Sequence, residues 1–419
     1  MKAVISSFGS SGDFNPCLGL ARVLSEKGVE VIFLSNPFHE KQILQAGLRF
    51  YPAGEYFDVF KEIQGNPDYL HARKGPRAVW ELVLKTVPVM YCAMKKLIIE
   101  ETPDLIASHI LEYGGMLAAK ERSIPYATLS TTPMGWFNTQ PPGYLNYTEF
   151  PLWLRTLQAQ CMHFLMNIAF KYSLKPLCKK LGLPQEIGCI DDVFGKAFLN
   201  LGLWSNNLRN SAIDDPPCTK ICGFVRDEHI KDWQDVPGEI TQLFEGEKQP
   251  VVVGLGSTAS LHGSNIYHAA AEACKQIDWP CLLIGKDSAQ LADSGKSIHA
   301  LDFAPFGWVF PRSSLIIHHG GLNTTAEALR AGVPSLVIPH AYDQFDNAIR
   351  TQHLGVTCRV KVNKVAAESL GLILKKILAD SQMYQKAKDI SQKIIAEPDG
   401  AEIASEMLAK FHVLGYISC

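Results

Sequence analysis

The chain contains two copies of one local pattern, a short apolar run that leads directly into a glycine-rich loop. The first copy, KAVISSFGSSGDFNP, spans Lys2–Pro16, and the second, PVVVGLGSTASLHGS, spans Pro250–Ser264. A buried strand that enters a helix through a glycine turn is the usual opening of an α/β unit with a parallel sheet. We therefore predict an α/β fold of two Rossmann-like domains facing a central cleft, where a ligand would bind.

Length and composition agree with two domains. A chain of 419 residues, 47% of them hydrophobic, can bury two sizeable cores. Residues 207–249 are rich in Pro, Asp and Asn, which is typical of a linker. We predict an N-terminal domain over 1–206 and a C-terminal domain over 250–381. Residues 382–419 have a helical pattern and could return to pack on the N-terminal domain.

Short apolar, β-branched runs that alternate with helical stretches predict the strands of the two sheets. In the first half they alternate with helical patterns such as Leu18–Lys27. Beyond the two openings, the predicted strands are Val29–Ser35, Asp104–Ser108, Tyr126–Ser130, Pro280–Ile284, Leu315–Ile317 and Ser335–Ile338.

Charge and cysteine usage exclude several classes of protein. The 40 Lys and Arg residues nearly balance 42 Asp and Glu residues, so the overall charge gives no reason to expect a nucleic-acid partner. The eleven cysteines are scattered, without CxxC pairs or Cys/His clusters. This pattern favours a reducing compartment and argues against a disulfide scaffold or structural zinc site. Since no apolar run reaches transmembrane or signal-peptide length, we expect a cytoplasmic protein.

The densest group of candidate binding residues is HHGGLNTTAEALRAGVPSLVIPHAYDQFDNA, from His318 to Ala348. Thr324 and Glu327 have the spacing of a capping box that would start a helix, and Gly332 would end it. A helix entered through glycines presents free backbone N–H groups and the positive end of its dipole. Both of these features favour a phosphate.

Polar side chains on either side of this predicted helix could converge on one ligand. His319, Asn323 and Thr324 would add donors at the helix entrance, while Asp343 and Gln344 follow the next predicted strand. Ligands of open α/β sheets bind outside the carboxyl ends of the strands, so we expect a phosphate attached to a group rich in hydroxyls. Structural roles are the alternative: glycines make ordinary turns, and a single histidine is more often structural than a ligand.

The region from Pro151 to Leu183 has the pattern of a long amphipathic helix with aromatic residues, methionines and a basic end. Such a stripe most often packs into a core; an apolar acceptor pocket and a peripheral membrane contact are the alternatives. The aromatic residues of Phe57–Trp80 and Met134–Trp153 favour a flat or lipid-like small molecule.

Taken together, these stretches resemble the UDP-glycosyltransferase family, whose members have the two-domain GT-B fold. The plant branch of that family carries the signature HCGWNSxxE, followed at a fixed distance by DQ. The segment FAPFGWVFPRSSLIIHHGG resembles bacterial members more closely, including rhamnolipid-type rhamnosyltransferases and sterol or macrolide glycosyltransferases. The residues that match the signature in register are His319, Gly321, Asn323, Thr324, Glu327, Asp343 and Gln344.

The resemblance implies a role for each part of the signature. The N-terminal domain would bind the acceptor and the C-terminal domain the nucleotide sugar. His319, Asn323 and Thr324 would hold the pyrophosphate, Glu327 the ribose hydroxyls, and the DQ pair the sugar hydroxyls.

Three further residues complete the predicted donor site. The glycine loops contribute Gly12 and Ser257, and Phe303 lies near the position where the family stacks the base. Here the sequence has FAPF where the plant pattern has WxPQ, and the segment lies two residues nearer the histidine. The sequence therefore leaves uracil and thymine open.

The first half departs from the family at the catalytic positions. Members typically have a GHxxP loop whose histidine removes the acceptor proton, with a later aspartate that orients it. Here Asp13 occupies the place of the histidine, and His109 occupies the place of the later acidic residue. The resemblance thus implies an inverted dyad with Asp13 as the base. A structural reading remains open: Asp13 could cap a helix that begins near Asn15, and His109 could simply end a buried strand.

The resemblance implies an inverting, metal-independent glycosyltransferase. It would transfer a sugar from UDP-glucose, or from a dTDP- or UDP-linked deoxysugar, to a hydroxyl of a small, largely apolar acceptor. It implies no cofactor besides this co-substrate; Asp214 and Asp215 are interpreted as a solvated turn and not as a DxD metal site. A nucleotide-sugar epimerase on the same fold and a catalytically silent sugar-nucleotide-binding protein are the alternatives.

Overall fold

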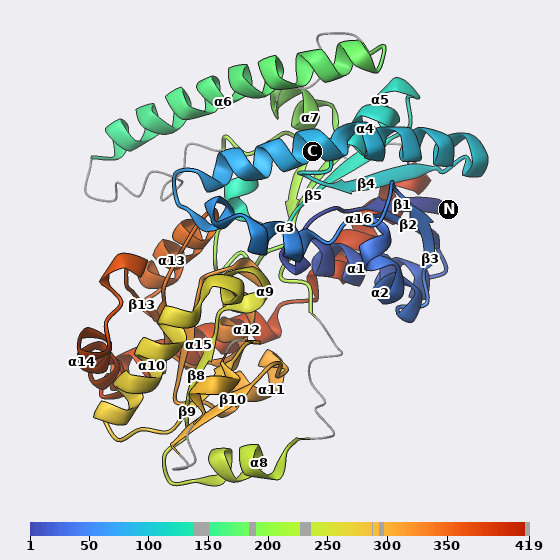
Figure 1. Cartoon of the computed structure of the whole chain (residues 1–419). Coiled ribbons are helices and arrows are strands. Elements are labelled where there is room, and N and C mark those ends of the chain that lie inside the picture. The colour runs from blue at the N-terminus through green and yellow to red at the C-terminus, as the bar shows by residue number, and fades with distance from the viewer. Residues whose placement is uncertain (137–150, 184–189, 227–235, 287, 293–296, 415–419) are drawn as a thin grey trace. The chain divides into compact units, whose positions relative to one another are not determined.

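The computed structural model describes residues 1–414 except 137–150, 184–189, 227–235, 287 and 293–296 (Figure 1). Within this part, the chain forms two compact units, each built around its own parallel sheet. Unit 1 comprises residues 1–59, 76–226 and 398–419, and unit 2 comprises residues 60–75 and 227–397. Both units are α/β, and the predicted fold class is confirmed.

The sheet of unit 1 has seven strands in the order β3-β2-β1-β4-β5-β6-β7, and all of its paired strands are parallel. The chain adds β2 and β3 on one side of β1, then returns to add β4 on the other side. The strands are β1 (Lys2–Ser6), β2 (Glu30–Ser35), β3 (Arg49–Pro52), β4 (Leu105–His109), β5 (Tyr126–Ser130), β6 (Leu199–Gly202) and β7 (Thr219–Ile221).

Helices cover both faces of this sheet, because the strands are apolar on both sides. In β1, Ala3 and Ile5 face one core with α1, α2 and α16, whereas Val4 faces a second core with α4 and α5. The helices of unit 1 are α1 (Ser11–Glu26), α2 (Glu40–Gln45), α4 (Gly75–Glu101), α5 (Tyr113–Glu121), α6 (Leu152–Lys180), α7 (Ile190–Lys196) and α16 (Gly400–Leu414).

Unit 2 has a six-stranded sheet in the order β10-β9-β8-β11-β12-β13, again with parallel pairs only. The strands are β8 (Val251–Gly254), β9 (Cys281–Ile284), β10 (Ile298–Leu301), β11 (Leu315–His318), β12 (Ser335–Val337) and β13 (Thr357–Arg359). The helices are α3 (Val59–Gly65), α8 (Gly238–Glu245), α9 (Gly256–Ala259), α10 (Ser264–Gln276), α11 (Phe306–Val309), α12 (Leu322–Ala331), α13 (Gln344–His353), α14 (Ala367–Leu378) and α15 (Ser381–Ala396).

The two sheets share one topological feature. The first strand of each, β1 or β8, lies inside the sheet, and the chain turns back to place β4 or β11 beside it. This reversal creates a switch point at which the loops after the two neighbouring strands diverge and leave a crevice. The sequence predictions at 29–35, 104–108, 126–130, 280–284, 315–317 and 335–338 agree with the observed strands to within one residue at each end.

The helix α6 corrects one expectation. Near its carboxyl end it packs into the second core of unit 1 through Leu174 and Cys178, and Phe170 lies on the Trp80 ring of α4 at 4.0 Å. Most of the helix is not core, however: Trp153 and Phe164 are 68% and 64% exposed. Apolar residues therefore occur around α6, and the predicted core stripe is wrong for its first half.

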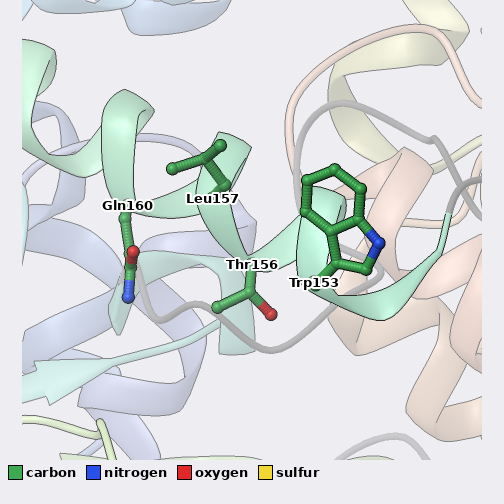
Figure 2. A pocket seen from close by; sticks show the side chains of 4 residues that line it. All are labelled: Trp153, Thr156, Leu157 and Gln160. Carbon is green, nitrogen blue, oxygen red and sulfur yellow. The ribbon is translucent and has the colours of Figure 1, made fainter.

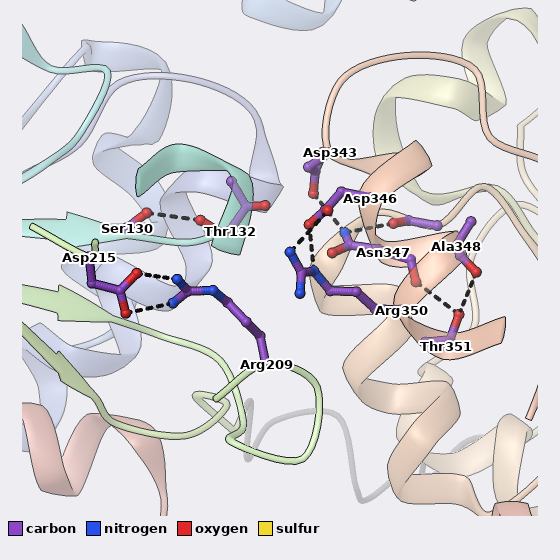
Figure 3. A network of polar contacts seen from close by, with 11 residues as sticks. Ser130, Thr132, Arg209, Asp215, Asp343, Asp346, Asn347, Ala348, Arg350 and Thr351 are labelled. Carbon is purple, nitrogen blue, oxygen red and sulfur yellow. Dashed lines mark hydrogen bonds and ion pairs between the residues drawn. The ribbon is translucent and has the colours of Figure 1, made fainter. Parts of the chain in front are cut away.

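The acidic pair in the predicted linker is not a solvated turn. The Asp215 side chain is only 3% exposed and forms a bidentate ion pair with Arg209, whose side chain is equally buried (Figure 3). The same carboxylate accepts the N–H of Ala212 at 2.8 Å. This pair fixes the segment between β6 and β7, because a buried charge without its partner would be strongly destabilising.

The predicted C-terminal helical pattern is broken into two helices at Asp399. Its carboxylate accepts the N–H groups of Ala401 at 2.7 Å and Arg226 at 3.0 Å, and α16 then packs against α1. Among the nine cysteines of the described residues, eight are free thiols and Cys218 is part of a disulfide.

Gly400 provides a test of the packing of α16. Its N–H donates to the Phe224 carbonyl at 3.0 Å, and a Cβ at this position would overlap the carbonyl oxygen of Gly223. Because both partners are backbone atoms, Gly400→Ala should lower the free energy of unfolding by about 1–3 kcal/mol. Denaturant titration measures this change. Gly195→Ala, in an exposed helix of the same unit with open space at its Cβ, is the matched control and should not destabilise the protein.

Candidate functional site

Asp13 and His109 meet at the switch point of unit 1. Asp13 lies in the first turn of α1, directly after β1, and His109 is the last residue of the neighbouring strand β4. Asp13 Oδ1 and His109 Nε2 are 3.6 Å apart; the imidazole is 1% exposed and the carboxylate 28%. The two residues predicted as a dyad therefore lie side by side, with the carboxylate as the accessible member.

Hydrogen bonds define the tautomer of His109. Its Nδ1 accepts the N–H of Leu111 at 3.3 Å, and burial lowers the pKa of the ring, an effect that Asp13 partly opposes. A neutral imidazole that accepts through Nδ1 carries its proton on Nε2. This Nε2–H lies 3.1 Å from the hydroxyl of Thr131 and on the side of Asp13. In this pair, the carboxylate of Asp13 is therefore the proton acceptor.

Asp13 also caps α1, although not as the sequence predicts. The helix begins at Ser11, with Ser10 as its N-cap, and not near Asn15. Asp13 Oδ2 accepts the backbone N–H of Ser10 at 3.2 Å and its hydroxyl at 3.3 Å, as in a capping box. Oδ1 is the oxygen nearest His109, so capping and proton acceptance use different atoms of one carboxylate. Gly12 lies in the same turn.

Glu112 is a buried carboxyl that the sequence analysis did not identify. It is the N-cap of α5, where Oε1 accepts the N–H of Gly115 at 2.7 Å. Oε2 accepts the hydroxyl of Ser6 at 2.6 Å, and this hydroxyl is 2.7 Å from that of Ser108. Burial raises the pKa of Glu112 to about 7, opposed by the hydrogen bonds from Ser6 and Gly115. The network ties the carboxyl ends of β1 and β4 together beneath the dyad.

His319 lies at the switch point of unit 2, directly after β11 and beside the loop that follows β8. Its ring packs against two glycines. A Cβ at Gly256 would lie 2.5 Å from the ring, and one at Gly321 would overlap Nε2. Both positions therefore require glycine for the ring to occupy this place. Ser257 follows on α9, with an exposed side chain.

The helix α12 starts at Leu322, with Gly321 as its N-cap, so the predicted capping box is wrong. Thr324 lies inside the first turn and is buried, and the carboxylate of Glu327 forms an ion pair with Arg330 one turn later. Gly321 has no side chain, so the N-cap residue itself makes no side-chain capping bond to α12. The positive end of its dipole lies at the carboxyl edge of the sheet, with Asn323 in the same turn.

A second helix, α13, starts beside this loop. Asp343 is its N-cap (Figure 3), and Gln344 is its first residue. Asn347 connects the two: its Nδ2 donates to the Gly320 carbonyl and to Asp343 Oδ2, both at 2.9 Å. Gln344 Oε1 accepts the N–H groups of His340 at 2.8 Å and of Ala341 at 3.1 Å. The carbonyl half of Gln344 therefore holds the turn after β12.

The structure separates one predicted residue from this group. Phe303 follows β10, which is two strands away from β8, and its ring is 73% exposed. Among the described residues, no group of three or more His, Cys, Asp or Glu side chains has the arrangement of a metal site. Each unit thus presents its predicted residues at the carboxyl edge of its own sheet.

The raised pKa of Glu112 predicts a pH-dependent stability. Between pH 4.5 and about 7 the folded carboxyl keeps a proton that the unfolded one releases, so the free energy of unfolding falls as pH rises through this interval. Glu112→Gln stays neutral and can keep the bonds to Ser6 and Gly115. It should exceed the wild type in stability at pH 8 by about 3 kcal/mol and lose this advantage near pH 4.5. Denaturant titrations at both pH values measure the difference, with Glu40→Gln, at an exposed helix start, as control. Equal pH profiles for wild type and Glu112→Gln would contradict the assignment.

Comparison with known proteins agrees with this architecture. Residues 282–410 match the family model described as erythromycin biosynthesis protein CIII-like, C-terminal domain. The sterol 3-beta-glucosyltransferase of Debaryomyces hansenii is 24% identical over 93% of the chain, which spans only 26% of the length of that relative. The NDP-glycosyltransferase YjiC of Bacillus subtilis is 23% identical, over 96% of this chain and 94% of its own.

The solved structure of the kitacinnamycin glycosyltransferase superposes on 98% of both chains with a TM-score of 0.72 and 20% identity. At this identity the likeness establishes the fold alone. Together with the relatives above, it confirms the predicted resemblance: the chain has the GT-B fold, its residues 282–410 match an EryCIII-like C-terminal domain, and it is similar to sterol and natural-product glycosyltransferases.

Proposed function

We propose that the protein is an inverting glycosyltransferase that transfers a sugar from a nucleotide diphosphate sugar to a hydroxyl of a small, largely apolar acceptor. The observation that carries the proposal is the pair of Asp13 and His109 at the switch point of unit 1. The Asp13 carboxylate is accessible, and the buried His109 imidazole has its N–H on the side that faces it. The names of the relatives, which include glucosyltransferases and an NDP-glycosyltransferase, support the same donor class.

In this mechanism Asp13 is the base. The acceptor O–H transfers its proton to Asp13 Oδ1 while its oxygen attacks the anomeric carbon, and the bond from that carbon to the diphosphate oxygen breaks with its electron pair. His109 Nε2–H lies on the side of Asp13 Oδ1 and 3.1 Å from the Thr131 hydroxyl, so the imidazole would orient the carboxylate without competing for the acceptor proton. Attack from the face opposite the leaving group inverts the anomeric centre.

The donor is assigned to unit 2. The N-terminus of α12, with His319, Asn323 and Thr324, would hold the diphosphate and stabilise the charge that develops on it as the bond breaks. Asp343 and the amide nitrogen of Gln344 would contact the sugar. Glu327, which forms an ion pair with Arg330, would bind the ribose hydroxyls. Gly12 and Ser257 would contribute from the glycine-rich loops. The exposed ring of Phe303 would stack on the base, either uracil or thymine.

The acceptor is assigned to the exposed apolar side chains of α6. On this helix Trp153, Thr156, Leu157 and Gln160 line an open hollow of about 720 Å³ (Figure 2). A largely apolar molecule would bury this surface favourably. Two segments, Phe57–Trp80 and Met134–Trp153, are predicted to contact the acceptor. Residues 60–75 of the first belong to unit 2, and residues 137–150 of the second lie outside the described residues.

The exposed aromatic residues of α6 are also the basis for a proposed peripheral membrane contact. None of the described helices combines the length and apolar character required to span a bilayer. The eight free thiols are the basis for the proposed cytoplasmic location.

The function is tested by incubating the protein with UDP-glucose or dTDP-glucose, with and without apolar hydroxylated acceptors, and identifying the products by mass spectrometry. His319→Ala should lower both donor affinity and transfer, because it removes a group beside the diphosphate. An altered sugar in the reaction without acceptor would indicate an epimerase. Binding without turnover would indicate a silent binding protein. Full activity of a folded His319→Ala variant would exclude its phosphate role.

The base is tested by Asp13→Asn. Asparagine keeps an oxygen that can accept the Ser10 N–H, so α1 should still form, but it cannot take a proton. Transfer should fall by about 10²–10⁴-fold, with donor affinity little changed.

His109→Ala should have a smaller effect on transfer, since the imidazole only donates toward Asp13. Ser10→Ala, which removes the hydroxyl contact to the same carboxylate, controls for a loss of capping. Turnover and donor affinity of all three variants distinguish the possible roles of Asp13 and His109. Wild-type turnover in Asp13→Asn would reduce this residue to a helix cap, and equal losses in Asp13→Asn and His109→Ala would make the imidazole an equal participant.

A further inference from the structure

His340 is a buried histidine for which neither the sequence motifs nor the proposed mechanism provides a role. It follows β12, which pairs with β11, so it lies one strand away from His319 at the same edge of the sheet. Its side chain is largely buried, and within the described residues neither Nδ1 nor Nε2 makes a hydrogen bond of good geometry, although the Ile338 carbonyl lies close enough to the ring to raise its pKa. A buried imidazole with two unsatisfied nitrogens is rare in native proteins and requires an explanation.

Of the two neighbouring histidines, one also has a ring nitrogen without a hydrogen bond and the other does not. His319 Nδ1 also lacks a hydrogen-bond partner in the described chain, and the His340 ring lies near enough to His319 to help lower the pKa of that residue. By contrast, Nδ1 of His318, on the strand itself, accepts the N–H of Gly320 at 3.1 Å. The unsatisfied nitrogens therefore belong to the two rings beyond the strand ends, where ligands of α/β sheets bind.

The turn that carries His340 is held rigidly. Gln344 Oε1 accepts the backbone N–H of His340, and Tyr342 has a left-handed backbone conformation, with φ of 54°. The Tyr342 hydroxyl donates to the Tyr69 carbonyl, which belongs to the same unit. Such strain in a non-glycine residue persists only when surrounding contacts fix it, and it is concentrated at ligand-binding sites.

The protonation state of the ring indicates which ligand it suits. Burial lowers the pKa of His340 to about 4, with a further lowering by His262 and an opposing effect of the Ile338 carbonyl. At neutral pH the ring thus has one donor and one acceptor. A diphosphate oxygen can only accept, and would leave one nitrogen unsatisfied. Sugar hydroxyls both donate and accept, so they can satisfy both nitrogens.

We propose that His340 is a specificity-determining residue that binds hydroxyls of the donor sugar through both ring nitrogens. The inference rests on the proposed function and extends its sugar subsite beyond Asp343 and Gln344. It also gives Gln344 a second role: its side-chain carbonyl accepts the N–H groups of His340 and Ala341 and so positions the backbone of His340, while its amide nitrogen would contact the sugar.

Two variants test the proposal. His340→Leu keeps similar volume without polar atoms. Because the ring has no hydrogen bond of good geometry to lose, this variant should raise the Tm of the free protein by about 2–4 °C. It should also weaken binding of UDP-glucose or dTDP-glucose about 10-fold and leave binding of UDP or dTDP unchanged. His340→Gln retains a donor and an acceptor and should recover part of the affinity for the nucleotide sugar. His318→Leu is the matched control: it leaves the Gly320 N–H unsatisfied and should lower the Tm.

The outcomes are distinct. An equal loss of affinity for nucleotide and nucleotide sugar in His340→Leu would move the residue to the phosphate and overturn the proposal. A lower Tm with unchanged affinities would make it structural and would also overturn it. If the wild type binds no nucleotide, the proposed function fails and this inference fails with it. Calorimetry and thermal denaturation of wild type and variants provide all of these measurements.

Discussion

The structure depends on the requirement that a parallel sheet bury both of its faces. Each strand must then be apolar on both sides, so polar residues are confined to the strand ends. In β1 the run Ala3 to Ile5 is fully buried, and the first polar side chain that leaves the sheet toward solvent is in the loop that follows. The reversal of strand order at β1 and β8 opens a crevice at that same edge. The location of the candidate residues is therefore a consequence of the folding constraint.

The sequence predicts most interior strands but not β6, whose Asn200 interrupts the apolar run, and it predicts none of the edge strands. Strands with neighbours on both sides, such as β4 and β11, are continuous apolar runs. The four edge strands, β3, β7, β10 and β13, were not identified. They have three or four residues each and include exposed or partly exposed positions. Short, mixed strands protect a sheet edge against further pairing, and this protection removes the pattern by which a strand is recognised.

The candidate site likewise contains residues that the sequence predicts and residues that it does not. Asp13 with His109, and His319 with Gly321, could be predicted because each residue follows a recognisable strand within a known frame. The Glu112 network could not, because it depends on the approach of Ser6 and Ser108, which are 102 residues apart. Glu327 is predicted to cap the helix, but it pairs with Arg330 three residues later because α12 begins earlier than a capping box at Thr324 requires. Spacing along the chain indicates which residues can interact, but tertiary packing selects the partner.

Neutral donors dominate the edge of unit 2, and this bears on how it could stabilise a diphosphate. Burial holds the pKa of His319 and of His340 well below neutrality, and the arginines of α12 and α13 are paired with Glu327 and Asp346. A fixed cation would attract the diphosphate of the intact donor and, more strongly, the released diphosphate, which carries more negative charge. Helix N–H groups and neutral imidazoles form hydrogen bonds that strengthen as charge develops on the leaving oxygen. An uncharged, pre-oriented edge therefore favours departure of the diphosphate over its tight retention.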